Sequence, residues 1–341
     1  MITRLKLDHF TAFSNLDIHL SKGINIFIGE NGTGKTHILK TLYSACCTID
    51  SREQKTFAQK INDVFYPSNK QIGRLVMRSV GRGTAELEVY KETKNHQKSS
   101  IKLSITTLGN KTETSQSKWQ ENERFSATYI PVKDMMANAP GFVALYANKE
   151  IHFEEIYVDI INKAYLPTIK GPTSKDRKKL LEILQKAMSG TVVEKNGEFY
   201  LKNKSGNLEF TLLAEGYRKL GLLWTLIQNG TLTEGSVLFW DEPETNLNPK
   251  LTSTVVEVLL ELQRQGVQIF LATHDYMLLK EFDLRHRNTD VIQFFSLFQS
   301  EGNILFNTTP DFNVISPNAI EEAFTGLIEN EIKREMGSLG K

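Results

Sequence analysis

The stretch Gly29-Glu30-Asn31-Gly32-Thr33-Gly34-Lys35-Thr36 matches the phosphate-loop pattern G-x-x-x-x-G-K-[S/T] at every fixed position. An apolar run at residues 24–28 leads into it, and a run compatible with a helix, residues 37–43, follows it. The motif requires this strand–loop–helix context. Its glycines let backbone N–H groups turn toward phosphate oxygens, and the helix start adds further N–H groups. The stretch therefore predicts a nucleotide-phosphate site rather than a glycine-rich turn that matches by chance.

Two residues of this loop and two carboxylates further along the chain predict chemistry on the nucleotide. We expect Lys35 to reach the β- and γ-phosphates and the Thr36 hydroxyl to bind Mg²⁺. The apolar strand at residues 237–240 ends in Asp241 and Glu242. Asp241 would hold Mg²⁺ through water or through Thr36, and Glu242 would orient and deprotonate the attacking water. Carboxylates are common at strand ends, so this catalytic interpretation depends on the phosphate loop upstream.

The amino-acid composition limits the class of protein that the chain can be. The chain has 341 residues, of which 40% are hydrophobic and 24% charged, and its net charge is +1. These values are typical of a globular protein and show no global bias toward nucleic acid or anionic membranes. Cys46 and Cys47 are adjacent, so we expect both to be reduced, and no metal-ligand spacing occurs. The first residues lack a signal-peptide core and no run is long enough to span a bilayer, which predicts a cytoplasmic protein without a membrane partner.

Hydrophobic patterning predicts strands in the first part of the chain. Residues 2–20 alternate and indicate two strands that precede the phosphate-loop strand. Residues 75–80 and 85–90 are expected to form a hairpin through the turn at residues 81–84. Further strands are expected at 101–106 and 125–130, and residues 109–123 are expected to form an exposed loop.

The rest of the chain predicts helices, a hairpin and a second α/β segment. Residues 134–190 favour helices, Asn196-Gly197 indicates a hairpin, and the last third shows buried strands at 237–240 and 267–271 with a final helix at 317–336. We expect an α/β fold with a mixed central sheet, an antiparallel β lobe and a short helical insertion. The expected division is one unit over residues 1–341, with an N-terminal lobe to 133, an insertion at 134–230 and an α/β part at 231–341.

A resemblance to a known group becomes specific at residues 241–249. The run Asp-Glu-Pro-Glu-Thr-Asn-Leu-Asn-Pro resembles the Walker B and D-loop of ABC-type ATPases, the group shared by transporters, SMC proteins and RecF. The resemblance implies a P-loop NTPase fold of ABC type that uses ATP and Mg²⁺ and hydrolyses ATP, with the D-loop residue Asn246 at the nucleotide. The strand before His274 is similar to the one that carries the group's switch histidine, which would contact the γ-phosphate. A satisfied core histidine is the alternative.

The group also has a signature sequence that completes the site of a second copy. Residues 213–220 lie in its place, just before the Walker B strand, and form a degenerate match. Ala214 replaces the serine, Glu215 replaces a glycine, and Gly216 is retained. The resemblance implies that these three residues contact nucleotide in trans, whereas the helix over residues 216–227 could equally be ordinary core.

Three basic residues are further candidates for phosphate contacts. Arg218 or Lys219 could compensate for the missing serine hydroxyl of the signature. Residues 129–134 lie where the group has its Q-loop, but they contain no glutamine. Lys133 in this segment either approaches phosphate or is an exposed loop lysine.

Two more segments narrow the resemblance to one branch. Residues 7–13 resemble SMC, RecF and OLD-type heads, and residues 214–219 and 238–244 resemble a bacterial branch of stand-alone "AAA family" ATPases, the AAA-21/OLD-like group. Several members serve antiphage defence, such as the PtuA ATPase of Septu and some retron systems. The resemblance implies a homodimer or higher oligomer that acts as a nucleotide-gated switch on a separate effector, a nuclease or toxin.

Two alternatives remain open. One is a RecF-like ATPase that binds DNA during repair. Its candidate footprint consists of basic residues, namely Lys175, Arg177, Lys178, Lys179, Lys202 and Lys204. A charge run is more often a solvated face. The weaker alternative is the ATPase subunit of a transporter.

Overall fold

The phosphate-loop strand β3 (Ile24–Gly29) lies inside a sheet that has six strands within the described residues, in the order β14-β13-β3-β12-β11-β7. The other strands of this sheet are β7 (Ala127–Ile130), β11 (Val237–Asp241), β12 (Gln268–Ala272), β13 (Ile292–Ser300) and β14 (Asn303–Thr309). The computed structural model describes residues 1–50, 54–78, 81–93, 95–109, 112–117, 119–120, 125–148, 151–171 and 173–339.

The central strands of this sheet are parallel. β3 pairs with β12 and β13, and β11 pairs with β12 and β7, all in parallel, while β14 is antiparallel at the edge. Every residue of β3, β11 and β12 is buried. Strands covered on both faces are mostly apolar, as the sequence predicted for residues 24–28, 237–240 and 267–271. Because the strands are parallel, their carboxyl ends meet along one edge of the sheet.

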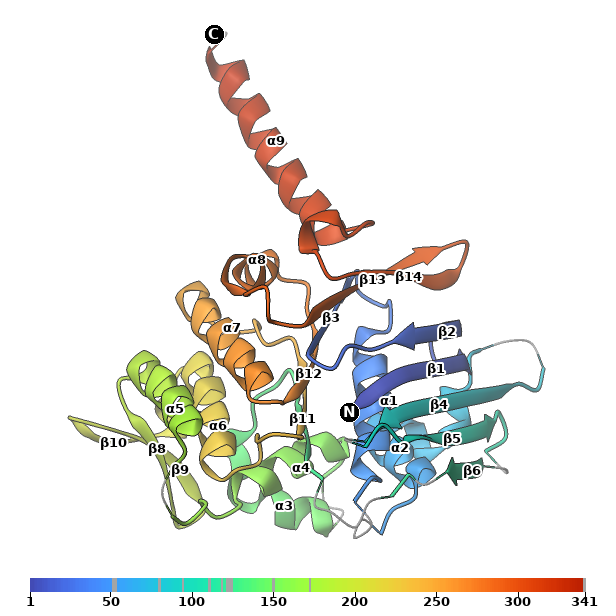
Figure 1. The fold of residues 1–341 in the computed structure, drawn as a ribbon, viewed down its shortest axis with the longest axis horizontal. Helices are drawn as coiled ribbons and strands as arrows, with labels where there is room; N and C mark the ends of the chain where they lie inside the picture. Colours follow the sequence, from blue (N-terminus) through green and yellow to red (C-terminus); the bar gives the residue numbers. More distant parts are fainter. Residues whose placement is uncertain are drawn as a thin grey trace.

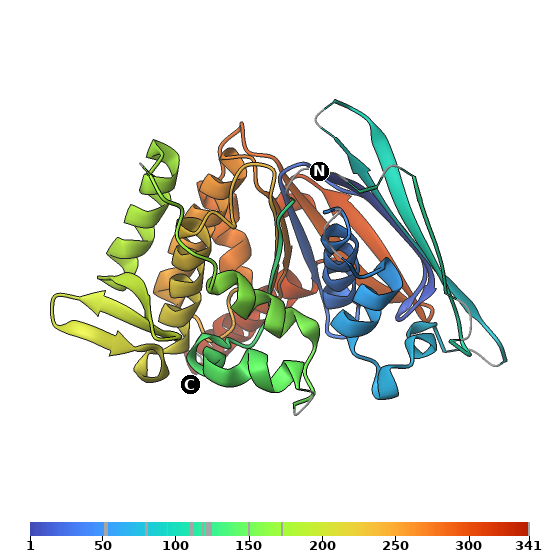
Figure 2. The ribbon, with the colours of Figure 1, turned by 90° about the horizontal axis from the view of Figure 1, so that it is seen from below.

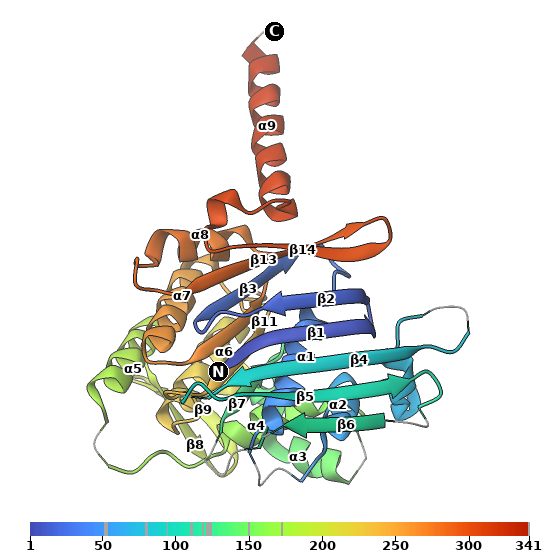
Figure 3. The same cartoon turned by 45° about the vertical axis from the view of Figure 1, so that its right-hand side comes forward.

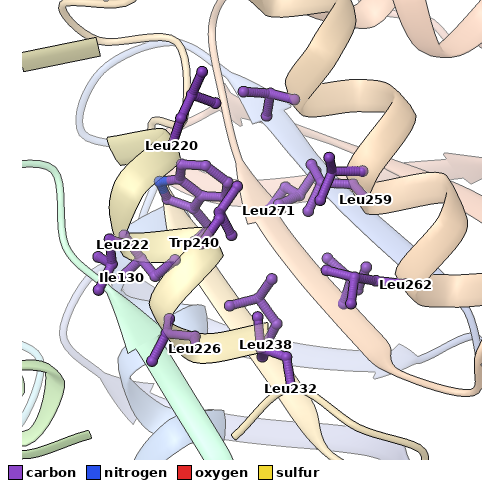
Figure 4. Packing of buried hydrophobic residues seen from close by; sticks show 14 of the residues in the cluster. Ile130, Leu220, Leu222, Leu226, Leu232, Leu238, Trp240, Leu259, Leu262 and Leu271 are labelled. Atoms are coloured by element: carbon purple, nitrogen blue, oxygen red, sulfur yellow. The ribbon is translucent and has the colours of Figure 1, made fainter. Parts of the chain in front are cut away.

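The side chains of these strands alternate between two cores. Trp240 and Leu271 enter the core formed with helices α6 (Glu215–Gln228) and α7 (Pro249–Arg264), as Figure 4 shows. Phe239 and Phe270 enter the core on the other face, with helix α1 (Lys35–Cys47). The sheet is therefore the middle layer of the fold.

An antiparallel lobe covers the face with α1. Its sheet has the order β2-β1-β4-β5-β6, and Figure 3 shows these strands side by side. Their bounds are β1 (Ile2–Phe10), β2 (Phe13–His19), β4 (Thr84–Glu92), β5 (Lys98–Thr106) and β6 (Thr112–Ser117). Figure 2 shows this lobe and the helical part with α6 on opposite sides of the molecule.

The remaining elements lie around these layers. A small sheet has the order β10-β9-β8, with β8 (Thr191–Lys195), β9 (Glu198–Asn203) and β10 (Gly206–Glu209). The other helices are α2 (Phe57–Phe65), α3 (Ala139–Ala147), α4 (Glu155–Ala164), α5 (Lys175–Met188), α8 (Tyr276–Arg285) and α9 (Ala319–Leu339). Short 3-10 helices are η1 (Ser68–Lys70), η2 (Ile72–Leu75), η3 (Met136–Asn138), η4 (Phe210–Leu212) and η5 (Phe312–Val314). The predicted mixed sheet, antiparallel lobe and helical insertion are confirmed.

The predicted hairpin of residues 75–80 and 85–90 is wrong. Leu75 ends the 3-10 helix η2, and Val76 makes an isolated bridge with Phe10. Residues 79 and 80 of the expected first strand lie outside the described residues. Strand β4 instead pairs with β1 and β5, since its alternating apolar side chains belong to the core of the antiparallel lobe.

Four strands and one helix of the structure were not predicted from the sequence. Residues 112–117 form edge strand β6 inside the segment expected to be a loop, of which residues 110, 111, 118 and 121–123 lie outside the described residues. Serine and threonine on an edge strand give no apolar alternation, although threonine favours β structure. Strands β10, β13 and β14 and helix α8 were also not predicted.

The predicted final helix is confirmed as α9, which extends away from the body (Figure 1). The ring of Phe324 stacks on Tyr276 with centroids 4.1 Å apart. Further along the helix, Leu327, Ile332 and Met336 are exposed. Within the described ranges, every helix is too short or too polar to cross a bilayer.

Candidate active site

The predicted site residues follow the carboxyl ends of neighbouring strands. The phosphate loop follows β3, Asp241 ends β11 with Glu242 next to it, and His274 follows β12. Open α/β sheets bind ligands outside this edge. The fold therefore brings together motifs that are more than 200 residues apart in the sequence.

The phosphate loop has the backbone that its glycines permit. Gly29, Gly32 and Gly34 have φ values of 139°, 83° and 87°. Thr33 closes the loop by donating from Oγ1 to the carbonyl of Glu30 at 2.8 Å, and Glu30 and Asn31 are exposed at its tip.

Helix α1 begins directly after Gly34. No side chain caps its first turn, and none of the residues there is acidic. The first N–H groups of a helix carry partial positive charge, so this end of α1 is suited to bind phosphate.

Lys35 is folded back over the loop. Its Nζ donates to the carbonyls of Gly29 at 2.7 Å and Glu30 at 2.9 Å. Burial lowers the pKa of Lys35, and the carboxylates of Asp241, Glu242 and Glu244 counter that shift. Backbone carbonyls of the loop therefore hold the ammonium group, and an anionic ligand in the loop could contact it.

Asp241 joins the two motifs. Its Oδ1 accepts a hydrogen bond from Thr36 Oγ1 at 3.2 Å, and its Oδ2 accepts one from the Tyr129 hydroxyl at 3.1 Å. Burial raises the pKa of Asp241, and the bonds from Thr36 and Tyr129 oppose that rise. A hydroxyl and a carboxylate are hard oxygen donors of the kind that Mg²⁺ takes beside phosphate oxygens. The residues present therefore fit a magnesium ion bound together with a nucleotide.

Glu242 and His274 form a pair beside this contact. His274 Nε2 lies 2.9 Å from Glu242 Oε1, and Thr245 Oγ1 donates to Glu242 Oε2 at 2.9 Å. The side chain of His274 is 37% exposed, so the alternative of a core histidine does not describe it. The side chains of His274 and Glu242 are both partly exposed, at 37% and 28%.

The signature-like segment begins helix α6. Ala214 occupies the N-cap position without a side-chain cap, and it is exposed. The carboxylate of Glu215 accepts a hydrogen bond from Asn246 Nδ2 at 2.9 Å. Gly216 packs closely on the D-loop, because a Cβ there would lie 3.4 Å from the Asn246 carbonyl oxygen. The segment and the D-loop of one chain are therefore in direct contact.

Arg218 and Lys219, the residues suggested to compensate for the missing serine hydroxyl, both have partners within the chain. Arg218 Nε lies 2.7 Å from Asp134 Oδ2, and Lys219 Nζ donates to the Thr245 carbonyl at 2.5 Å. Lys219 is buried, whereas the side chain of Arg218 stays partly exposed. Lys133 is exposed.

Sequence reasoning missed Tyr129 and Thr245 as residues of this site, and it named Lys219 only as a candidate phosphate contact. Tyr129 bonds to Asp241, and Lys219 and Thr245 bond to Glu242, through hydrogen bonds that only the tertiary fold creates. Tyr129 had a weak signal, because it lies in a strand segment that was aligned with the Q-loop region. Neither of the other two stands in a motif position that predicts its partner.

Comparison with known proteins agrees with this geometry. The fold is similar to the SMC head bound to the C-winged helix domain of ScpA, with a TM-score of 0.58, 13% identity and coverage of 90% of this chain and 97% of that chain. It is also similar to the Smc head domain bound to the C-terminal domain of ScpA derived from Pyrococcus furiosus, with a TM-score of 0.56, 12% identity and coverage of 97% and 99%. The chain therefore has the fold of an SMC head, a P-loop NTPase.

Sequence relatives lead to the same class. The DNA replication and repair protein RecF of Streptococcus suis (strain 05ZYH33) is 37% identical over 81 residues, which are 24% of this chain and 21% of that protein. RecF of Clostridium tetani (strain Massachusetts / E88) is 37% identical over 90 residues, 26% of this chain and 24% of that protein. The matches thus span about a fifth to a quarter of these relatives. The fold and the phosphate loop define the chain as a P-loop NTPase with the fold of an SMC head, and part of its sequence is similar to RecF.

A family profile matches a longer part of the chain than these relatives do. The profile of the family described as "AAA domain, putative AbiEii toxin, Type IV TA system" matches residues 89–280, more than half of the chain. The chain belongs to this family.

Proposed function

We propose that this protein binds ATP with Mg²⁺ between the phosphate loop and the strand end of β11, and hydrolyses it there. The hydrogen bond from Thr36 to Asp241 carries the proposal, because it joins the two motifs in one place. When bound, Mg²⁺ would supply positive charge at the phosphate oxygens, held by Thr36 and Asp241. The backbone N–H groups at the start of α1 and the ammonium of Lys35 would bind the phosphates.

The pair of Glu242 and His274 would carry out the proton chemistry. In the structure each Glu242 oxygen has a partner, His274 at one and Thr245 at the other. These contacts fix the carboxylate at the rim of the site, where it would accept a proton from an attacking water. His274 would donate a hydrogen bond to the γ-phosphate once that phosphate replaces Glu242 as its neighbour.

Hydrolysis would control the association of two copies. The uncapped and exposed start of α6, with Ala214, supports a contact to the nucleotide of a second chain. The carboxylate of Glu215 accepts a hydrogen bond from Asn246 of the same chain. This contact would reduce its repulsion of a phosphate group bound to a second chain. ATP drives closure only to the extent that it binds the closed dimer better than the open one.

The first test uses the variant Glu242→Gln. This change should slow hydrolysis about 100-fold or more while ATP still binds, so an ATP-bound dimer accumulates. Analytical ultracentrifugation with Mg²⁺ and ATP measures the dimer, and the double variant with Lys35→Ala is the control that should stay monomeric. A Glu242→Gln protein whose mass does not depend on ATP would contradict the switch, and unaltered turnover would remove Glu242 from the mechanism.

The proposed role of the switch is control of an effector in antiphage defence. The name of the matched family refers to a toxin of a type IV TA system, and the motifs resemble antiphage ATPases; both support this role. Plaque counts on cells that carry the gene with its neighbours should fall, and the Lys35→Ala gene should restore them. Equal plaque counts for the two genes would exclude the proposed role in defence but would not contradict the proposed ATP hydrolysis.

A RecF-like role at DNA is the second candidate, and the similarity to RecF favours it. The candidate basic residues lie at the two ends of α5, since Lys175 to Lys179 begin the helix and Lys202 lies beside Gly190 after its end. Lys179 also pairs with Glu261 at 2.7 Å. Binding to duplex DNA that falls steeply with salt would support this candidate. Absence of DNA binding at low salt would exclude it.

A further inference from the structure

Helix α6 is bonded to the turn that carries Glu242. We call residues 242–247 the D-loop turn. Lys219 lies on the second turn of α6, and its Nζ donates to the carbonyls of Thr245 at 2.5 Å and Glu242 at 3.5 Å. The residue is only 2% exposed. One buried ammonium group therefore holds two backbone oxygens of the D-loop turn.

The backbone of Glu242 needs such support. Its φ is 48°, in the left-handed region that is unfavourable for a residue with a side chain. Its N–H donates to the carbonyl of Ala272 on the neighbouring strand, and its own carbonyl accepts from the N–H of Thr245. Lys219 adds a charged donor to this turn, and a strained conformation persists only where its surroundings determine it.

Two more contacts fix α6 on the same turn. Glu215 accepts from Asn246, and Gly216 allows close packing, since a Cβ there would lie 3.3 Å from Leu247 Cδ1. Arg218, the neighbour of Lys219, pairs with Asp134 after β7. The start of α6 is thus tied to the segments after β11 and after β7.

We propose that Lys219 is a positioning residue for ATP hydrolysis, which acts by holding the D-loop turn so that the Glu242 carboxylate faces the phosphate site beside His274. The proposal rests on the proposed function of Glu242 as the base. Lys219 itself touches neither nucleotide nor water in this role. It links the helix that begins with the signature-like segment to the carboxylate of the same chain.

Four carboxylates surround the Lys219 ammonium group. Burial lowers the pKa of Lys219, and the carboxylates of Glu215, Glu244, Asp134 and Glu242 counter that shift. Removal of the ammonium leaves the carbonyls of Glu242 and Thr245 with one donor fewer while the acidic groups remain. The turn then loses one of the contacts that restrain the φ of Glu242.

The test is a double-mutant cycle of Lys219→Met and Glu242→Gln. Lys219→Met keeps the length of the side chain without its charge. It should slow single-turnover hydrolysis about tenfold and leave the affinity for Mg²⁺ and a fluorescent ATP analogue within about twofold. Because both residues act through one carboxylate, the double variant should be no slower than Glu242→Gln alone.

Lys60→Met is the matched control. Lys60 is 3% exposed and pairs with Asp159 at 2.7 Å, away from the D-loop turn. Its loss should lower the melting temperature without slowing hydrolysis by the folded protein. If Lys219→Met does not fold, Lys219→Gln takes its place in the cycle, since it keeps an N–H donor without the charge.

The outcomes separate the two proposals. Equal losses of affinity and rate in Lys219→Met, or losses that multiply in the double variant, would overturn the positioning role. A slow Glu242→Gln beside a Lys219→Met of wild-type rate would also overturn it while the proposed function stands. Wild-type hydrolysis by Glu242→Gln would instead overturn the proposed function.

Discussion

At the scale of single residues, the predicted side chains meet at one edge of the sheet. Lys35, Thr36, Asp241 and Glu242 were predicted from two motifs, because each motif fixes residue types at a short spacing. Their roles at the nucleotide remain proposals. The partners that orient them could not be predicted, since Tyr129 reaches Asp241 across 112 residues of sequence, a contact that depends on strand order.

A buried carboxylate near the site gives a prediction about pH. Glu244 accepts from Thr273 Oγ1 at 2.8 Å and from the His274 N–H at 3.2 Å. Its Oε2 is buried without a hydrogen-bond partner among the described residues, and burial raises its pKa. The ionised form is thus disfavoured in the folded state, so ionised Glu244 lowers stability at neutral pH and not below about pH 4.

The variant Glu244→Gln should therefore be more stable than the wild type at pH 7. We expect a gain of about 1 kcal/mol, or about 2 °C in melting temperature, which disappears as the pH falls toward 4. Melting curves between pH 4 and 8 measure it. The control Glu257→Gln changes an exposed glutamate of α7 and should show no such trend. A gain for Glu244→Gln that does not depend on pH would contradict the explanation.

At the scale of elements, the antiparallel lobe supports the phosphate loop. A Cβ on Gly34 would lie 2.4 Å from Cζ of Phe13, which belongs to β2. The loop was predictable from its motif, but this contact was not, because it joins the loop to a strand of the separate antiparallel sheet. For the same reason the partner of β4 was mistaken: alternation predicts a strand and its buried face, whereas pairing depends on tertiary packing.

Two glycine variants test this support. Gly34→Ala should lower the free energy of unfolding by about 2 kcal/mol or more, because it adds a clash with Phe13 to the cost of a positive φ. Gly32→Ala is the matched control, since its φ of 83° is similar and no atom lies within 4 Å of its Cβ position. Denaturant unfolding measures both. Equal losses would show that Phe13 does not restrict the loop.

At the scale of the whole molecule, the fold places every proposed element of catalysis beside one sheet edge. The α/β class, the antiparallel lobe and the helical insertion followed from apolar runs and motif context. The direction of α9 could not be predicted in this way, because helical periodicity predicts an apolar face but not the surface on which that face packs. Phe324 stacks on Tyr276, while Leu327 and Met336 further along the helix are exposed.

The most direct test of the account is the Mg²⁺-dependent affinity for ATP, measured by isothermal titration calorimetry on the wild type, Lys35→Ala and Lys22→Ala. The wild type should bind one ATP per chain, and Lys35→Ala should bind roughly 10- to 100-fold more weakly, because it lacks a charged donor to phosphate. Lys22, whose side chain is 62% exposed, is the matched control and its variant should bind as the wild type does. Equal affinity in all three proteins would contradict the site described here.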